Sequence, residues 1–243
     1  VIGMQLTGEI VAYDGECMTI RVPFRDTEQM IHKRIHSAQV ILEDGRRISA
    51  EQRRKIFALV EDIGEYAGSI PRSKAAKAAQ AEFMRHMQLL YLIDRADTEA
   101  VRRQLTYHYC SLCDLELFSL SSVDMSTARD FIDWLVEKCI EFDVPCLDTL
   151  LYRCEDVERY LYLCVRHRRC ALCGAKADIH EVDTVGMGRN RNAIHHLGQR
   201  VQPLCRKHHA EVHSIGQKRF NERYHLDSVK LDAALCKILG WRK

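Results

Sequence analysis

Cysteine and histidine residues with the spacing of metal ligands gather between positions 170 and 213 of this 243-residue chain. Cys170 and Cys173 form a Cys-x2-Cys pair, and Cys205 and His208 form a Cys-x2-His pair. Two such pairs are typical of a structural zinc ion that four ligands hold in a tetrahedral site. The sequence therefore predicts one closed zinc site from these four residues.

Three further histidines in the same stretch are candidates for a second metal site. His209 and His213 are four residues apart, so on a helix they share one face, and His180 lies between the two cysteine-containing pairs. A site with three protein ligands leaves a coordination position open, which a hydrolytic metal site requires. The alternative is a plain zinc-binding domain with surplus histidines.

The order of these residues, from Cys170 to His213, resembles that of HNH (ββα-metal) nuclease modules. In that family the strand after the first cysteine pair ends in two adjacent functional residues. The first of these residues binds the catalytic metal, and the second is the general base. The DNase colicins, which share the layout, have His-His at this pair. The resemblance assigns the two roles to His180 and Glu181. It also implies Zn²⁺ in the closed site and Mg²⁺ or another divalent metal in the open one.

The predicted general base of this module is a carboxylate, and carboxylates are intrinsically weaker bases than imidazole. His195 or His196, in the loop between the two halves of the motif, is the alternative base. Arg200 stands nearest to the family's middle position, which is often Asn and orients the base. An arginine there is expected to stabilise charge on the transition state. The candidate catalytic residues are therefore Glu181, His195, His196 and Arg200.

Basic residues concentrate in the C-terminal third of the chain. From Arg159 to Lys243 there are 17 Lys and Arg residues against 7 Asp and Glu, a net charge of +10. Because the whole chain carries +2, the part before Arg159 carries −8. A basic region suits contact with nucleic-acid phosphates, and the alternative is an ordinary solvated surface. The candidate DNA contacts here, two of them in a Gly-containing segment at 186–191, are Arg189, Arg191, Lys207, Lys218 and Arg219.

Two stretches of the N-terminal part resemble the phage Orf (NinB) recombination family. One covers residues 39–64, with basic residues at a turn and at the start of a helix, and the other covers residues 125–145. The resemblance implies an α+β domain that forms a homodimer and binds single-stranded, gapped or branched DNA. It also implies assistance to single-strand-binding protein and recombinase. The implied contacts, which act through phosphate charge, are Arg46, Arg47, Arg53, Arg54 and Lys55.

The expected fold is α+β, with an Orf-like DNA-binding and dimerisation domain at 4–156 and a zinc-stabilised HNH-like module with C-terminal helices at 157–243. Ser49 and Gln52 form a capping-box pattern that predicts a helix behind them. Pro71 is expected to open a helix over 74–94, and Ser126 to cap a helix that ends before Pro145. The remaining predictions are two strands within 4–24, a short helix at 27–34, a strand at 39–42 with a turn at 43–45, a helix at 97–105, an irregular segment with some strand at 108–120, and helix or turns at 148–159.

The eleven cysteines occur without a signal-peptide pattern, which favours a reducing, cytoplasmic location in a bacterial host cell. No apolar run approaches the ~18–20 residues that cross a membrane, so no membrane partner is expected. Cys110 and Cys113 form a second close pair that is expected to be structural, with a redox role or a shared metal as alternatives. Buried thiols are expected at Cys17, Cys139, Cys146, Cys154, Cys164 and Cys236.

Three functions are consistent with these patterns. The leading hypothesis is a phage recombination mediator that binds single-stranded or gapped DNA and carries an HNH module. The second is an active metal-dependent HNH endonuclease. The third is a protein-docking factor whose zinc module binds a partner such as single-strand-binding protein. Binding to DNA that weakens steeply with salt separates the first two functions from the third.

Overall fold

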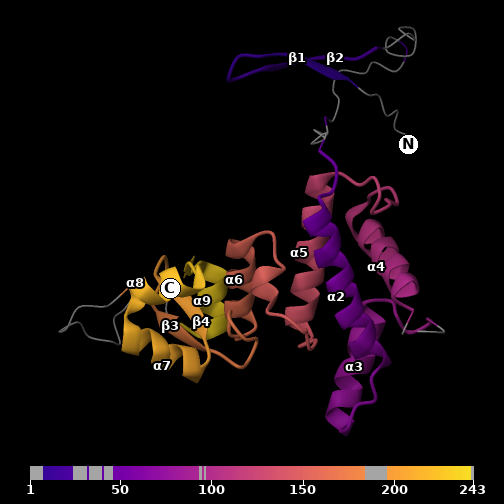
Figure 1. The fold of residues 1–243 in the computed structure, drawn as a ribbon. Coiled ribbons are helices and arrows are strands. Elements are labelled where there is room, and N and C mark those ends of the chain that lie inside the picture. The colour runs from indigo at the N-terminus through magenta and orange to yellow at the C-terminus, as the bar shows by residue number, and fades with distance from the viewer. Residues whose placement is uncertain are drawn as a thin grey trace. The chain divides into compact units, whose positions relative to one another are not determined.

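The protein is described by a computed structural model in which the chain divides into two compact units, Val1–Glu43 and Asp44–Lys243. Helices and small sheets are both present (Figure 1). The predicted helix at 27–34, strand at 39–42 and turn at 43–45 lie outside the described residues, apart from His32, which is helical, and Val40. The described residues are 8–23, 32, 40, 46–92, 95, 97–183 and 196–241.

In the first unit, strands β1 (Glu9–Tyr13) and β2 (Met18–Arg21) form an antiparallel hairpin, as predicted. Asp14 closes the turn between them, because one carboxylate oxygen accepts hydrogen bonds from the backbone N–H groups of Glu16 and Cys17 at 3.0 and 2.7 Å. Cys17 is exposed in this turn, so the prediction that its thiol is buried is wrong.

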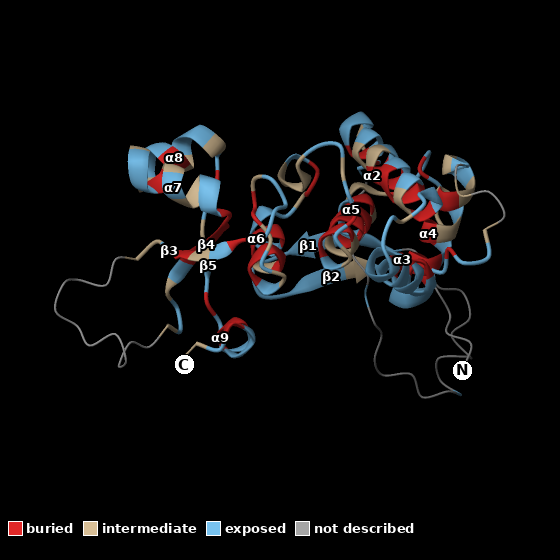
Figure 2. Cartoon of the chain, turned by 90° about the horizontal axis from the view of Figure 1, so that it is seen from below, coloured by how far each residue is buried: buried red, intermediate tan, exposed pale blue. Residues whose placement is uncertain are grey.

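In the second unit, four helices pack around a shared apolar core. Helix α2 packs against α3, α4 and α5, and the buried residues gather where these helices face one another (Figure 2). Side chains with no exposed surface, such as Leu59, Leu105 and Leu135, come from three different helices of the set. The helices are α2 (Ala50–Gly68), α3 (Lys74–His86), α4 (Thr98–Cys113) and α5 (Met125–Glu141).

The predicted capping box at the start of α2 is confirmed. The Ser49 hydroxyl accepts a hydrogen bond from the backbone N–H of Gln52 at 3.0 Å, and the Gln52 side-chain oxygen accepts one from the backbone N–H of Ser49 at 3.1 Å. These bonds satisfy two N–H groups at the helix start. The Gln52 amide also donates to the Met125 carbonyl at 3.2 Å, which ties the start of α2 to that of α5.

Pro71 does not open the next helix, so that prediction is wrong. Helix α3 begins after Ser73, whose hydroxyl accepts a hydrogen bond from the backbone N–H of Ala76 at 3.1 Å. A side-chain acceptor satisfies an N–H group at a helix start, and Pro offers none. The helix ends at His86, short of the predicted position 94, because Gln88 adopts a φ of 57°, which a right-handed helix does not contain.

The boundaries of the next two helices also differ from the prediction. Helix α4 continues through Cys113, and the segment from there to Leu120 contains no strand. Helix α5 is capped by Asp124 in place of Ser126, because the Asp124 carboxylate accepts a hydrogen bond from the backbone N–H of Thr127 at 2.8 Å. The prediction that this helix ends before Pro145 is confirmed.

A three-stranded antiparallel sheet with the strand order β3-β4-β5 organises the C-terminal part. Helices α6 and α7 both pack against β4. The elements of this part are the short 3-10 helix η1 (Leu150–Tyr152), α6 (Val157–Arg166), β3 (Asp178–Glu181), β4 (Arg200–Leu204), α7 (Arg206–Ile215), α8 (Gln217–Tyr224), β5 (Val229–Lys230) and α9 (Ala233–Leu239).

Helix α6 joins the helical part to the sheet, because it packs against α5 as well as β4. The predicted domain boundary between 156 and 157 falls at the cap of this helix, Asp156, and stays a prediction. None of the helices in the described part of the chain combines the length and the apolar character that crossing a membrane requires.

Candidate metal centres

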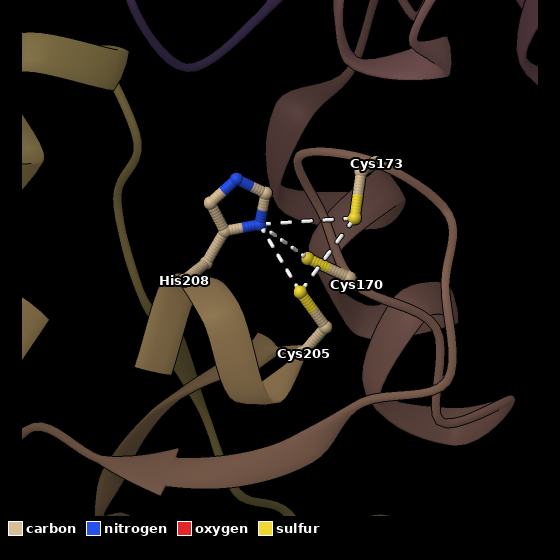
Figure 3. A group of neighbouring side chains, drawn as sticks. All are labelled: Cys170, Cys173, Cys205 and His208. Carbon is tan, nitrogen blue, oxygen red and sulfur yellow. Dashed lines mark hydrogen bonds between the residues drawn. The ribbon is translucent and has the colours of Figure 1, made fainter. Parts of the chain in front are cut away.

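The first cysteine pair lies in a tight turn at residues 170–175. The backbone N–H of Cys170 donates to the Ala175 carbonyl at 2.7 Å, and the N–H of Gly174 donates to the Cys170 carbonyl at 2.8 Å. Gly174 has a φ of 68°, a conformation that glycine adopts without steric cost. This turn places the side chains of Cys170 and Cys173 on the same side of the chain (Figure 3).

The second pair lies where β4 ends and α7 begins. Cys205 is the N-cap residue of α7, and the backbone N–H of His209 donates to its carbonyl at 2.8 Å. His208 is three residues further on, in the first turn of the helix, so its ring is a neighbour of the Cys205 side chain. The antiparallel pairing of β3 with β4 carries this helix start back to the 170–175 turn.

The four ligand atoms have the spacing of a tetrahedral zinc site. The Nδ1 of His208 lies 3.3 Å from the sulfurs of Cys170 and Cys205 and 3.7 Å from that of Cys173 (Figure 3). The sulfurs of Cys173 and Cys205 are 3.7 Å apart. With Zn–S of about 2.3 Å and Zn–N of about 2.0 Å, a tetrahedron requires S···S and S···N separations of about 3.8 and 3.5 Å. The residues therefore fit the predicted zinc ion.

The surroundings of these side chains shift their pKa values in different directions. Burial raises the pKa of the Cys170 thiol to about 12, so that thiol keeps its proton at neutral pH unless a metal ion replaces it. For Cys205, burial raises the pKa, but hydrogen bonds from the His208 backbone and from the other two thiols outweigh it and lower the pKa overall. Burial lowers the pKa of His208, which keeps its imidazole in the neutral form that binds metals.

The structure also brings the three remaining histidines together. His180 comes from β3, and His209 and His213 come from one face of α7. The Nδ1 of His180 lies 2.9 Å from the Nε2 of His209, which lies 3.3 Å from the Nε2 of His213. Three nitrogen ligands at about 2.0–2.1 Å from one tetrahedral ion lie about 3.3–3.4 Å apart. The donor set therefore suits a divalent metal and leaves a coordination position open.

His180 is buried, with 8% of its surface exposed, and burial lowers its pKa. Its Nε2 lies 2.9 Å from the side-chain oxygen of Gln217, the first residue of α8. Gln217 and its partner Gln202, which lies opposite His180 in β4, are not among the residues predicted from the sequence. The sequence did contain a signal for Gln202, because a glutamine in the otherwise apolar segment VQPL is cut off from water when that strand is buried. Such a side chain needs a hydrogen-bond partner inside the protein.

The predicted general base, Glu181, does not join the three histidines. It follows the buried His180 in β3 and is exposed, and successive side chains of a strand point to opposite faces. Its ladder partner Val201 is fully buried on the face away from His180. Asp178, which lies two residues before His180, shares the histidine face. Burial and the charge of His213 lower the pKa of His209, and the Asp178 carboxylate opposes them.

Two of the other candidate catalytic residues, His196 and Arg200, contact residues outside this group. The ring of His196 packs against Trp241, with ring centroids 4.8 Å apart. The Arg200 guanidinium donates two hydrogen bonds to the Asp183 carboxylate, at 2.7 and 2.9 Å. These hydrogen bonds raise the pKa of Arg200 and lower that of Asp183. His195 lies outside the described residues, so its predicted role stays a prediction, as do those of Glu181, His196 and Arg200.

The predicted DNA contacts near α2 fall into two kinds. Arg53 and Arg54 are exposed, as are Arg46 and Arg47, although the Arg47 guanidinium donates to the Ser122 carbonyl. Lys55 is instead engaged inside the fold, because its amine lies 2.7 Å from the Glu155 carboxylate and both side chains are mostly buried.

The predicted contacts near the metal centres are partly described. Lys207, Lys218 and Arg219 are exposed on α7 and α8. Arg189 and Arg191 lie outside the described residues, together with the segment at 186–191. DNA contact by any of these cations stays a prediction.

The remaining cysteines largely follow the expectation of buried thiols. Cys139, Cys154, Cys164 and Cys236 are buried and Cys146 is partly buried. Cys110 is buried and Cys113 is exposed at the end of α4, and in the described part of the chain this pair belongs to neither of the two groups that could hold a metal.

The chain was compared with known proteins. Residues 24–91 and 88–241 match the model of a family described as "Putative HNHc nuclease". The two matches together include both groups of potential metal ligands and helices α2 to α6, which precede them. No curated protein and no solved structure matches the chain.

Proposed function

The chain belongs to this HNH nuclease family, and from that premise we propose that it is a metal-dependent endonuclease that hydrolyses phosphodiester bonds in DNA. The observation that carries the proposal is the convergence of His180, His209 and His213, whose ligand atoms all lie within 4.8 Å of one another. A nuclease reaction needs a metal site with an open position, and a set of three imidazole ligands provides one.

In the proposed site one group of residues would hold the catalytic metal ion, and the other group would position the helix that carries two of its ligands. A divalent ion bound by the three histidines would polarise the scissile phosphate and stabilise the leaving oxygen. The Cys170, Cys173, Cys205 and His208 group would clamp the start of α7 to the 170–175 turn. Because His209 follows His208 directly, this clamp fixes where the second site's helical ligands stand relative to β3.

Lys207 supports the nucleic-acid substrate in this proposal. It is exposed in the first turn of α7, between residues that belong to the two metal groups. A cation there suits a phosphate of the bound strand through charge alone, so cleavage is expected to tolerate many sequences. The basic C-terminal third, with its net charge of +10, fits the same substrate.

Two carboxylates of β3, those of Asp178 and Glu181, are candidates for the general base of the proposed reaction, and a variant of each tests which one acts. Asp178 shares the face of His180, whereas Glu181 occupies the position that the family resemblance assigns to the base. Under the proposal Asp178→Asn lowers the cleavage rate more than Glu181→Gln, by the ~10²–10⁴-fold that a positioned base contributes. The reverse order would return the role to Glu181 on the strand's other face.

The central test is a cleavage and binding assay on labelled single-stranded, duplex, gapped and branched DNA. Cleavage is expected with Mg²⁺ or Mn²⁺, and loss of cleavage with EDTA or in His209→Ala. The control is that His209→Ala keeps one equivalent of zinc and its helical circular dichroism, because it leaves the Cys3His group intact. Wild-type protein that binds two metals and DNA but cuts no substrate would contradict the proposal.

That contradicting outcome is the one that the recombination-mediator prediction requires. Homodimer formation, binding to single-stranded or gapped DNA and assistance to single-strand-binding protein rest on the resemblance of residues 39–64 and 125–145 alone. The same assay addresses them, because tight, salt-sensitive binding without cleavage supports a mediator. Weak binding that is insensitive to salt supports the protein-docking factor.

A further inference from the structure

A chain of side-chain amides runs from His180 to a backbone carbonyl beneath the proposed catalytic site. The Nε2 of His180 lies 2.9 Å from the Gln217 oxygen. The Gln217 amide nitrogen donates to the Gln202 oxygen at 2.8 Å, and the Gln202 amide nitrogen donates to the Asp227 carbonyl at 2.9 Å. Asn221 braces the chain, because its side-chain oxygen accepts from both glutamines, at 2.7 and 3.0 Å.

The carbonyl at the end of this chain sets the direction of every bond in it. A backbone carbonyl only accepts, so the NH₂ group of Gln202 must face Asp227 and its oxygen must face Gln217. Gln217 must then present its NH₂ group to Gln202 and its oxygen to His180. An amide oxygen accepts, so the Nε2 of His180 must carry the proton.

A neutral imidazole has one proton, so a proton on Nε2 leaves the Nδ1 of His180 with a free lone pair. Nδ1 is the atom that lies 2.9 Å from the Nε2 of His209. Gln202 is fully buried and the His180 ring is nearly so, which excludes water as a competing partner along most of the chain. The direction of the amide hydrogen bonds therefore leaves Nδ1 without a proton, and Nδ1 is the nitrogen of His180 that would bind a metal ion in this site.

We propose that Gln217 is a positioning residue that, through Gln202 and the Asp227 carbonyl, holds His180 in the Nε2–H tautomer before a metal ion arrives. The inference deepens the proposed function, since it assigns the support of one ligand of the metal site. Groups that orient a metal-binding histidine from behind typically change metal affinity by about 10–100-fold when they are replaced. The Nε2–H tautomer of His180 can be measured in protein whose second site holds no metal, whereas the metal affinity cannot.

The test uses the whole 243-residue chain with zinc in the cysteine site and the second site empty. Long-range ¹H–¹⁵N correlation spectra report which nitrogen of His180 carries the proton, and titration with Co²⁺ reports the affinity of the second site. Gln217→Leu removes the acceptor, whereas Gln217→Glu keeps an oxygen toward His180 but loses the donors toward Gln202 and Asn221. Glu222→Gln, on the same helix and exposed, is the matched control.

The wild type and Glu222→Gln are expected to show the Nε2–H tautomer and equal Co²⁺ affinity. Gln217→Leu is expected to show a mixture of tautomers and Co²⁺ binding about 10–100-fold weaker. Gln217→Glu is expected to retain both the tautomer and the affinity, although it breaks the bonds to the other amides. Equal losses in both Gln217 variants would mean that the residue only supports the local fold, which would overturn the proposal.

The wild-type spectrum alone decides the matter if a variant fails to fold, because an Nδ1–H tautomer at His180 contradicts the directed chain of bonds. Failure of the proposed function looks different. If the wild-type protein binds no Co²⁺ at the second site while His180 still shows the Nε2–H tautomer, the endonuclease proposal is wrong. The proposed role of the amide chain then still holds. If the wild-type protein binds two metals but Gln217→Leu leaves the tautomer and the Co²⁺ affinity unchanged, the proposed role of Gln217 is wrong. The endonuclease proposal then still holds.

Discussion

Cys205 and His208 lie side by side because of the local structure of a short stretch of chain. They are three residues apart at the start of α7, where the N-cap residue and the first helical turn place their side chains together. Cys170 and Cys173 achieve the same within a glycine-closed turn. Each half of the site is thus a local structure, and tertiary folding has only to bring two halves into contact.

The zinc assignment predicts that Cys205→Ser removes one equivalent of bound zinc and lowers the melting temperature, because structural zinc contributes ~10–16 kcal/mol of apparent binding energy in small modules. Atomic absorption and thermal unfolding measure the two effects. Cys113→Ser is the matched control, since Cys113 belongs to the other Cys-x2-Cys pair and is exposed. Wild-type zinc content in Cys205→Ser, or zinc loss in Cys113→Ser, would show that the ligands are assigned wrongly.

At the scale of elements, the starts of helices α2 and α3 are both determined by a local side-chain cap, but the sequence predicts only the first correctly. The start of α2 is determined by Ser49 and Gln52, whose reciprocal hydrogen bonds need no other part of the chain. The start of α3 depends on a choice between Pro71 and Ser73, and only the cap hydrogen bond at Ser73 decides it. The preference of proline for a first helical turn favours Pro71, whereas the helix begins where the Ser73 hydroxyl satisfies a backbone N–H group.

The capping box predicts different costs for two substitutions at one position. Ser49→Ala removes the side-chain acceptor and is expected to lower the free energy of unfolding by about 1 kcal/mol. Ser49→Gly is expected to cost only a few tenths of a kcal/mol, because glycine lets water reach the unpaired N–H groups. Urea unfolding that finds no cost for Ser49→Ala would show that the hydroxyl bond to Gln52 adds no stability.

At the scale of the whole molecule, the tertiary structure separates cations that share a sequence cluster. Arg53, Arg54 and Lys55 are adjacent, and the family resemblance treats them alike. The fold exposes the two arginines and turns Lys55 toward Glu155, 100 residues further along the chain. The Glu155 carboxylate lies near the cap of α6, so this ion pair joins α2 to the C-terminal part.

Substitution of these neighbours is therefore expected to affect different properties. Arg54→Ala is expected to leave stability unchanged and, if Arg54 contacts a phosphate, to reduce the slope of log K against log salt for duplex DNA by ~0.9. Lys55→Ala is expected to lower the free energy of unfolding by about 1 kcal/mol, at the upper end for a partly exposed pair. Salt-dependent binding and urea unfolding measure the two. An altered salt slope in Lys55→Ala with unchanged stability would contradict this division.

The sequence by itself determined the separate halves of the two ligand groups, which are the pairs Cys170–Cys173, Cys205–His208 and His209–His213. It also determined the capping box of α2 and the end of α5 before Pro145. Each depends on residues that are close in the chain, where backbone geometry fixes which side chains are neighbours. Only the tertiary structure decided that Gln217 meets His180, that Gln202 meets Gln217 and that Lys55 meets Glu155, across 37, 15 and 100 residues. Such contacts depend on strand register and helix packing. A one-residue shift of β3 against β4 would bring Glu181 to the face of His209 and turn His180 away from it.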